Sequence, residues 1–418
     1  MFKDGLLKYE EENGRTWPPS HPENLRRLVC STNKEPIETR CHSIGEESNN
    51  GVLGTNLFTI WTWRHHNQIA SELLRINPCW NDEELYRTAR EINIAILSQI
   101  FFYEFNSLLL GAGNLYQEGI LSPTQGYRDL YDENVRPTLS IEYGVALRWM
   151  HTIQEGKAKM YDFEGNYLKS VDIANLTLRT GFLAVENHID YITQGAFRQA
   201  AGKIDQTIDP DMADAAFGVL QRATDLSTSD LAKNRLLGTA PYIWYRKQCF
   251  GDIIRSFDDL KEAINSEVRM YMYNYFKYLN FCFAQNIELL KELYKDVEDI
   301  DLLAGIWIER PIPGARVPAT FYCLIMDQLR RIVISDRHWY ERPNRPNAFN
   351  INQLLEIRKA TIARLMCDVG DKVTRIQPRA FLIPGPGNEI RSCSEIEKID
   401  IGAWKDPQCE QLCFKQHH

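Results

Sequence analysis

The stretch NLFTIWTWRHHNQIASELLRINP, residues 56–78, decides the fold. Its apolar side chains recur at steps of three and four residues, which places them on one face of a helix that Pro78 ends. Asn81 and the three carboxylates after it predict the start of a second helix, because they satisfy free N–H groups in a first turn. That helix is expected to run from about residue 83 to Leu110 and to end at Gly111. Long helices without a heptad pattern indicate a large buried core.

Helical periods extend over most of the remaining chain, whereas strand-like alternation is scarce and brief. Residues 1–55 carry proline and glycine turn signals and no sustained helical period, so we expect an irregular amino-terminal arm. We expect the helical core to span residues 56–405, followed by a tail over residues 406–418. No repeat, low-complexity run or linker divides the sequence, which predicts a mainly α-helical single domain with few short strands. The other predicted helices cover residues 139–153, 212–220, 257–280, 285–293, 317–334 and 351–366, and the strand-like piece covers residues 157–163.

The composition excludes several classes of protein. With 44% hydrophobic and 25% charged residues, the 418-residue chain has the average make-up of a folded soluble protein, which excludes disorder. Its net charge of −8 lacks the positive field that binds nucleic acids, so no nucleic-acid partner is expected. The most apolar stretch, residues 94–110, is interrupted by polar side chains, so we expect no membrane span. The first twelve residues carry carboxylates where a secretory signal is apolar, which predicts no export signal in the chain as written.

The ten cysteines indicate disulfide bonds rather than a metal site. Their number is even, and none forms a CxxC pair or a Cys/His cluster at zinc spacing. Cys30 and Cys41 flank a short polar segment, a loop that a bridge would stabilise by roughly 3 kcal/mol in the chain-entropy model. Asn175-Leu176-Thr177 is a glycosylation sequon, which fits a secretory history. The alternative, unpaired buried cysteines in a cytosolic protein, stays open on composition alone.

His151 is the first residue that could take part in chemistry. It ends an apolar helical stretch that begins near Ile141, so its neutral imidazole could bind a metal or a haem iron. Arg148, three positions earlier, lies on nearly the same helix face and could pair with a haem propionate. The alternatives are a histidine satisfied within the core and an arginine in an ordinary ion pair.

Two further segments are weaker candidates. His65 and His66 are neighbours in the helix over residues 56–78 and point about 100° apart, so they cannot bind one metal together. We expect one of them to be buried and the other solvated. Residues 225–235, followed by Gly238, are predicted to form a polar loop that enters a helix.

Several blocks of sequence, spread over about residues 1–405, carry a family resemblance. They are IWTWRHHNQIA (60–70), Asn77-Pro78, Trp80, DEELY (82–86), Ala89-Arg90, YEF (103–105), residues 142–152, residues 242–251, DQLR (327–330) and DRHWYE (336–341). Together they resemble the hallmark segments of the animal haem peroxidases, the peroxidase–cyclooxygenase superfamily. The resemblance implies a large, single-domain, mainly α-helical haem-peroxidase fold that lacks its distal amino-terminal part.

The resemblance assigns roles on the proximal side of a haem b site. It implies that His151 is the proximal ligand of the iron and that Arg148 pairs with a haem propionate. Asp230 stands where the family usually has an asparagine that accepts a hydrogen bond from the proximal imidazole. An aspartate there would make the imidazole more electron-donating, which lowers the reduction potential of the iron.

The resemblance also pairs six of the cysteines. It implies the bridges Cys30–Cys41, Cys249–Cys323 and Cys367–Cys393. Three such bridges favour an oxidising compartment, so we expect an extracellular or secretory location.

On the distal side the chain departs from the family. The distal histidine and the calcium ligand beside it would lie upstream of the point that matches Met1, so neither is expected in this chain. The catalytic arginine falls at Ser48. The residues that form covalent haem bonds fall near Gly51 and Val52, so no ester or sulfonium linkage is expected. The family's RDHG segment is RLLG here, at residues 235–238.

Two hypotheses of function follow. The first is a haem-peroxidase-family oxidoreductase that uses hydrogen peroxide and a small reducing substrate. It would be weak or inactive as this chain stands, with the peroxide-activating half supplied by a missing amino-terminal segment or a second chain. The second is a catalytically dead pseudoperoxidase that acts as an extracellular binding or matrix protein, which Ser48 and residues 235–238 favour. Residues 144–150 contain no tyrosine, which argues against fatty-acid oxygenation of the cyclooxygenase type. If the chain does use peroxide, His42 and His21 in the arm are the first candidates for its base.

Overall fold

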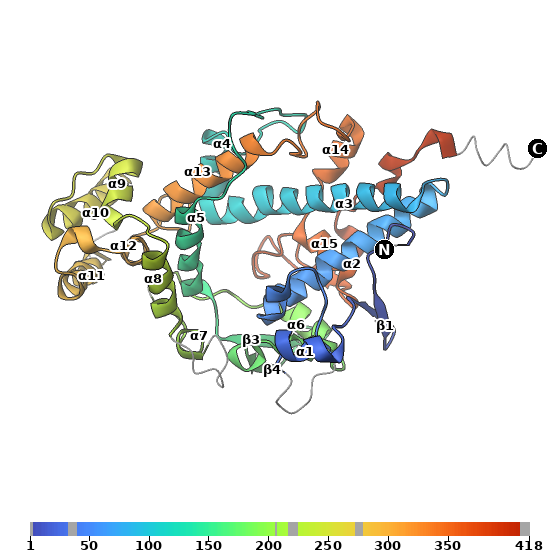
Figure 1. The fold of residues 1–418 in the computed structure, drawn as a ribbon, viewed down its shortest axis with the longest axis horizontal. Helices are drawn as coiled ribbons and strands as arrows, with labels where there is room; N and C mark the ends of the chain where they lie inside the picture. The colour runs from blue at the N-terminus through green and yellow to red at the C-terminus, as the bar shows by residue number, and fades with distance from the viewer. Residues whose placement is uncertain (1–2, 32–39, 205–206, 216–224, 272–278, 410–418) are drawn as a thin grey trace, which may run out of the picture.

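Two long helices form the centre of the molecule (Figure 1). The computed structural model describes residues 3–31, 40–204, 207–215, 225–271 and 279–409. Helix α2 (Leu53–Ile76) packs against helix α3 (Asp82–Gln99), which crosses the middle of the fold. Asn81 caps α3 by accepting a hydrogen bond from the backbone N–H of Glu84, as the sequence predicts.

The helical run that begins with α3 extends beyond Gly111, where its end is predicted. It passes through two π-helical segments, η2 (Ile100–Phe105) and η3 (Ser107–Gly111), into α4 (Ala112–Gln117). Gly111 has a φ of +86°, and a Cβ at this position would collide with the carbonyl oxygen of Gly314. The glycine therefore lets a distant loop approach closely and interrupts the helical backbone where the end is predicted, although one further short helix, α4, follows it directly.

The helical run Asp82–Gln117 is long and apolar enough to cross a bilayer by length and composition, with a mean hydropathy of 1.4 in its most apolar window. Its polar side chains nevertheless have partners inside the fold. Gln99 accepts a hydrogen bond from the Tyr340 hydroxyl at 2.7 Å, and Glu104 accepts one from the backbone N–H of Ile362 at 2.8 Å. These contacts tie the run to carboxyl-terminal segments, as in the core helix of a helical domain.

The amino-terminal arm is more regular than predicted. It contains, in chain order, a hairpin of β1 (Glu10–Glu12) and β2 (Arg15–Trp17), helix α1 (Glu23–Val29) and the 3₁₀ turn η1 (Glu47–Asn50). Trp17 is only 2% exposed, and the guanidinium groups of Arg40 and Arg64 lie over its ring. Because Arg64 belongs to α2, this stack holds the arm against the central helices.

The segment of His151 is a helix of two kinds. Ser140 caps α5 (Ile141–Ala146), which tightens into the 3₁₀ helix η4 (Leu147–Ile153). The single helix predicted over residues 139–153 is thus shorter at its start and changes its winding before His151.

The strand-like piece predicted over residues 157–163 forms one side of an antiparallel hairpin. Strand β3 (Lys157–Tyr161) pairs with β4 (Tyr167–Asp172), and α6 (His188–Ala196) packs on β3. Gly195 permits this packing, because a Cβ there would collide with a backbone carbonyl oxygen of β3. Two 3₁₀ turns connect β4 to α6, η5 (Ala174–Leu176) and η6 (Thr180–Ala184).

A lobe of helices lies beside the segment of His151 (Figure 1). It consists of α7 (Pro210–Ala215), α8 (Leu226–Leu236), α9 (Tyr242–Phe250), α10 (Phe257–Tyr271), α11 (Leu279–Leu293), the turn η7 (Val297–Asp299) and α12 (Leu302–Ile308). Helix α12 contacts α5, α8, α9 and η4, and so joins the lobe to the core. The helices predicted over residues 212–220 and 257–280 extend partly outside the described residues.

The carboxyl-terminal third covers the central helices. The helix predicted over residues 351–366 is two helices, α14 (Ile351–Ile357) and α15 (Ile362–Val369), because Thr361 caps a new helix by accepting from the backbone N–H of Arg364. The other elements are α13 (Ala319–Ser335), β5 (Arg375–Ile376) paired with β6 (Arg391–Ser392), η8 (Cys393–Glu395) and η9 (Ile401–Trp404).

Disulfide bonds brace the described part of the chain. They are Cys30–Cys41, Cys79–Cys409, Cys249–Cys323 and Cys367–Cys393. Three of them are the bridges that the resemblance implied. The bond between Cys79 and Cys409 joins residues 330 positions apart and is not predicted from the sequence.

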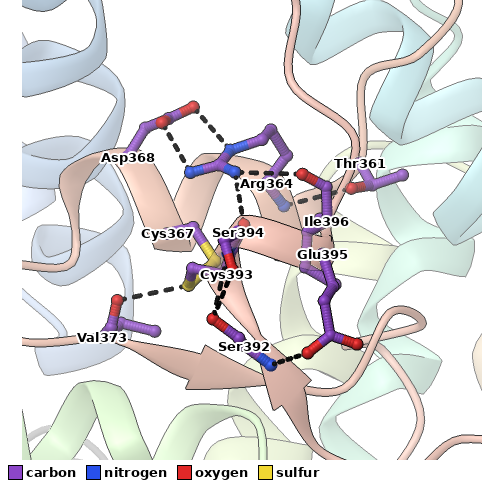
Figure 2. Close-up of a disulfide and its surroundings, with 10 residues drawn as sticks. All are labelled: Thr361, Arg364, Cys367, Asp368, Val373, Ser392, Cys393, Ser394, Glu395 and Ile396. Carbon is purple, nitrogen blue, oxygen red and sulfur yellow. Dashed lines mark hydrogen bonds and ion pairs between the residues drawn. A yellow bond between two sulfur atoms is a disulfide. The ribbon is translucent and has the colours of Figure 1, made fainter.

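Figure 2 shows how one bridge is built into its surroundings. Cys367 on α15 is bonded to Cys393. Arg364, nearly one turn earlier, donates to the carbonyl oxygens of Cys393 at 2.9 Å and Ile396 at 3.2 Å, and it pairs with Asp368 at 2.8 Å. The bridge and the arginine together hold residues 393–396 against α15.

Candidate functional site

His151 and Asp230 form a hydrogen-bonded pair between two elements. The Nδ1–H group of His151, on η4, donates to Oδ2 of Asp230, on α8, at 2.6 Å. The Asp230 side chain is fully buried, whereas 26% of the His151 side chain is exposed. Because a carboxylate only accepts hydrogen bonds, Nδ1 carries a proton, and in the neutral form of the ring Nε2 is the atom left to bind a ligand.

Local capping brings the two residues together. Ser140 starts α5 and Asp225 starts α8, each by accepting a hydrogen bond from a backbone N–H in the first turn. The two helices contact each other, and Asp230 faces the contact from the second turn of α8. Residues 225–235 are therefore a capped helix, with Asp225 as the polar entry that the sequence predicts.

Arg148 uses the second oxygen of the same carboxylate. Its guanidinium donates to Oδ1 of Asp230 at 2.8 Å, and the ammonium of Lys233 lies 3.9 Å from that oxygen. The buried charge of Asp230 is thus compensated by cations that are themselves partly exposed. The role of Arg148 toward a haem propionate stays a prediction. Lys233 is a member of this cluster that sequence reasoning missed, although its i,i+3 spacing from Asp230 is a usable signal.

Ser48 lies on the 3₁₀ turn η1. Its side chain is exposed, and its backbone N–H donates to the carboxylate of Glu46 at 3.3 Å. The turn is tied to the core where the carbonyl oxygen of Gly51 accepts from the backbone N–H of Leu178 at 3.0 Å. Ser48, Gly51 and Val52 bring no cation, carboxylate or thioether to the turn.

His42 lies in a closed polar cluster. The ring is fully buried, its Nδ1 atom is 2.9 Å from Oδ1 of Asn56, and Trp17 stacks on it at a centroid distance of 6.0 Å. Burial lowers the pKa of His42 to about 4. Among the described residues, Nε2 of His42 and Nε2 of His21 have no hydrogen-bond partner. A base must reach its substrate, so the burial of His42 argues against the acid–base role suggested by its position.

His65 and His66 are both buried, so the expectation that one of them is solvated is wrong. Nδ1 of His65 lies 2.7 Å from Oδ1 of Asn93 on α3, and Nε2 of His66 lies 3.0 Å from the carbonyl oxygen of Gly5. Helix α2 is covered on two sides, by α3 and by the amino-terminal arm. Burial lowers the pKa of both rings. Each ring thus links α2 to a neighbouring segment, α3 for His65 and the amino-terminal arm for His66.

Residues 235–238 end α8. Arg235 pairs with Asp301 at 2.8 Å, and Gly238 adopts a φ of +69° just beyond the helix. Leu236 and Leu237 are 85% and 49% exposed. The two leucines are therefore surface residues in this structure.

His151 is a single ligand, and a single protein ligand is compatible with an iron whose other ligands come from a macrocycle. In the described part of the chain, one group of three His, Cys, Asp or Glu ligand atoms is close enough for a metal, formed by Cys79, Asp406 and Cys409. Its two cysteines are bonded to each other and offer no thiolate. His151 offers a single nitrogen ligand whose orientation is fixed by a buried carboxylate, which is the arrangement that a proximal haem ligand needs.

Comparison with curated proteins identifies relatives along the whole chain. A family model described as animal haem peroxidase matches residues 1–381. The chain is 29% identical to a peroxidase of Drosophila melanogaster, over 100% of this chain and 58% of the relative. It is 29% identical to the peroxidasin homolog of Homo sapiens, over 97% of this chain and 26% of the relative. The chain thus spans little more than half of the first relative and about a quarter of the second.

Solved structures share the fold. Peroxidase A of Dictyostelium discoideum superposes with a TM-score of 0.72 at 23% identity, over 90% of this chain and 66% of that one. A fatty acid alpha-dioxygenase of Oryza sativa gives a TM-score of 0.61 at 17% identity, over 89% of this chain and 60% of that one. The mainly helical fold agrees with the family model that covers most of the sequence. The chain therefore belongs to the animal haem peroxidase family.

Proposed function

We propose that this chain binds haem through His151 and is a hydrogen-peroxide-dependent oxidoreductase of low activity on its own. The observation that carries the proposal is the pair of His151 and buried Asp230, 2.6 Å apart. A free histidine on a core helix needs no fully buried carboxylate. A ligating histidine almost always has a hydrogen-bond acceptor for its second nitrogen, which holds the ring in one tautomer and one orientation, and a buried carboxylate is one such acceptor.

Each residue of the cluster has a distinct task in this proposal. When bound, haem would supply the redox-active iron that reacts with hydrogen peroxide and oxidises a small reducing substrate. His151 would present Nε2 to the iron, and Asp230 would hold the Nδ1 proton. Arg148 compensates the charge of Asp230 and thereby stabilises the carboxylate in its buried position.

The low activity follows from residues inside the chain. Ser48 is neutral and cannot polarise an O–O bond as an arginine would. An acid–base group contributes roughly 10²–10⁴-fold and a positioned electrostatic group a comparable factor. Because His42 is enclosed, it does not replace them.

The second candidate is a pseudoperoxidase that serves as an extracellular binding or matrix protein. Ser48 and the exposed Leu236 and Leu237 favour it, because these changes lie within the family segments while the braced scaffold is retained. This candidate shares the fold with the first and differs from it in turnover.

Hemin reconstitution of the purified chain tests the first proposal. We expect a Soret band that His151→Ala abolishes or strongly shifts, while the matched variant His338→Ala, at an exposed histidine, leaves it unchanged. Identical spectra for His151→Ala and the parent would remove His151 as the ligand.

A turnover assay separates the two candidates. With hydrogen peroxide and guaiacol, a rate that exceeds an equal concentration of free hemin and disappears in His151→Ala supports an oxidoreductase. Haem binding with a rate no higher than hemin supports the pseudoperoxidase.

A further inference from the structure

The chain contains one asparagine sequon, Asn175-Leu176-Thr177. It lies on the 3₁₀ turn η5, directly after strand β4. The haem-site residues do not use it, and nothing in the proposed function depends on it.

The turn points the asparagine outward. Ala174 and Leu176 are 3% and 6% exposed, so the residues on either side anchor the turn in the core. Asn175 between them is exposed. Its Nδ2 atom donates to Oδ2 of Asp172 at 3.0 Å, an exposed side-chain contact that water can replace at little cost.

Backbone hydrogen bonds fix the turn independently of the asparagine side chain. Leu178, with a φ of +58°, donates its N–H to Gly51 at 3.0 Å and accepts at its carbonyl from the N–H of Ser31 at 2.8 Å. A substituent on the Asn175 amide therefore disturbs none of the contacts that hold the loop.

The surroundings of Asn175 are polar. Asp172 lies 3.7 Å from the ammonium of Lys157, and that ammonium lies 3.9 Å from Asp211. Charged side chains of this kind leave a hydrated surface, which accommodates a carbohydrate without displacing an apolar contact.

The disulfide bonds supply an independent argument. They form in the oxidising compartments of the secretory pathway, where asparagine-linked glycans are also attached. One of them, Cys30–Cys41, adjoins Ser31, which is bonded to the sequon loop.

We propose that Asn175 carries an N-linked glycan. The substrate class is a lipid-diphosphate-linked oligosaccharide. The Nδ2 atom forms a bond to the anomeric carbon of the first sugar, the bond from that carbon to the diphosphate oxygen breaks, and one Nδ2 proton is lost. No oxidant or reductant takes part.

The experiment expresses the full chain in eukaryotic cells behind an added secretion leader and treats the product with peptide N-glycosidase F. We expect the parent to shift in mobility by a single glycan. Asn175→Gln and Thr177→Ala should lose the shift, and the matched variant Thr177→Ser should retain it because the sequon survives.

Peptide mapping keeps the test decisive if a variant fails to fold. In the parent, the glycosidase converts a glycosylated asparagine to aspartate, so the peptide with Asn175 should appear in the aspartate form. An unmodified Asn175 in parent protein whose Cys30–Cys41 bridge has formed would overturn the proposal. The result is independent of haem binding, so it does not share its failure with the proposed function.

Discussion

A single buried carboxylate organises the candidate haem site. Asp230 uses one oxygen for His151 and the other for Arg148, and no part of its side chain reaches solvent. The carboxylate therefore affects both the orientation of the imidazole and its electron donation. These two effects can be separated by replacing the carboxylate with an amide, which still accepts a hydrogen bond but carries no charge.

Asp230→Asn should raise the reduction potential of bound haem and leave haem affinity largely intact, because the amide oxygen still accepts the Nδ1 proton but makes the imidazole a weaker donor. Spectroelectrochemical titration of the reconstituted protein measures the potential. Lys233→Gln, which changes a charge 3.9 Å from Asp230 without touching His151, is the matched control. A potential equal to that of the parent would show that the charge of Asp230 does not act on the iron.

The buried His42 makes stability depend on pH. Its pKa is about 4 in the folded chain, against an ordinary value of 6.5, because burial disfavours the charged ring. Between these values the unfolded chain binds more protons, so stability falls as the pH is lowered from 6.5 to 4, by about 3 kcal/mol in total. His42→Gln should remove this dependence, measured as the difference in unfolding free energy between variant and parent at each pH.

Glu104 gives stability the opposite pH dependence from His42. The effect of His42 must therefore be measured as the difference in unfolding free energy between His42→Gln and the parent, in which the contribution of Glu104 cancels. Burial raises its pKa to about 7 from 4.5, so its contribution to stability is present below pH 4.5 and is lost as the pH rises through 7. If the free energies of unfolding of His42→Gln and the parent run parallel from pH 4 to 6.5, His42 is not the source of the pH dependence.

At the level of elements, ion pairs of the same sequence spacing differ in environment. Arg364 and Asp368 on α15 are 11% and 13% exposed, whereas Arg331 and Asp327 on α13 are 51% and 55% exposed. Only Arg364 also donates to the backbone of residues 393–396 (Figure 2). Exposed pairs of this kind contribute little, and half-buried arginines with several acceptors contribute more.

Arg364→Lys should therefore destabilise the fold by about 1–3 kcal/mol, since an ammonium cannot reach both carbonyl oxygens and the carboxylate at once. Arg331→Lys, at the same spacing on an exposed face, should change stability by less than about 0.5 kcal/mol. Denaturant unfolding of both variants measures the difference. Equal losses would mean that the contacts of Arg364 beyond α15 are not stabilising.

The sequence predicts helices that are determined by neighbouring residues. It does not predict features that depend on contacts between residues far apart in the chain. The period of residues 56–78 predicts α2 to within three residues, and Asn81 marks the start of α3. The helical winding is interrupted at Gly111 as predicted, but the continuation into α4 and the contact of this glycine with a loop some two hundred residues away are not predicted. Both members of the His65–His66 pair are buried for a similar reason, since the arm that covers His66 has no periodic signal.

In the whole molecule, the candidate haem site also depends on a contact between residues that are distant in sequence. The family resemblance predicts that His151 and Asp230 meet, although 79 positions separate them, and the structure places them in contact. Periodicity alone leaves His151 a core histidine. The Cys79–Cys409 bridge could not be predicted in either way. The family resemblance does not pair these cysteines, and a separation of 330 positions leaves no local pattern to indicate the bond.

Removing the Cys79–Cys409 bridge should destabilise the fold more than removing Cys30–Cys41. In the chain-entropy model the cost grows with loop length, from roughly 3 kcal/mol for a short loop to about 5 kcal/mol for a loop of hundreds of residues. The double variants Cys79→Ser/Cys409→Ser and Cys30→Ser/Cys41→Ser leave no new free thiol and can be compared by denaturant unfolding. A larger loss for the short loop would place the stabilisation in local contacts instead.

The same bridge has a mechanical consequence. It closes most of the chain into a covalent ring, from which only the segments before Cys79 and after Cys409 extend. Tension applied to the two ends would load the segment before Cys79, which includes α1 and α2, and would then pass through one sulfur–sulfur bond, so that the elements between Cys79 and Cys409 stay unloaded. At about 3.5 Å per residue, and with Cys30–Cys41 also closed, unfolding these outer segments would extend the ends by roughly 270 Å, whereas the fully reduced chain would lengthen to roughly 1,500 Å. An oxidised molecule under load would therefore lose α1 and α2 while the ring between Cys79 and Cys409 stays closed, and a reductant would convert it into a much longer tether.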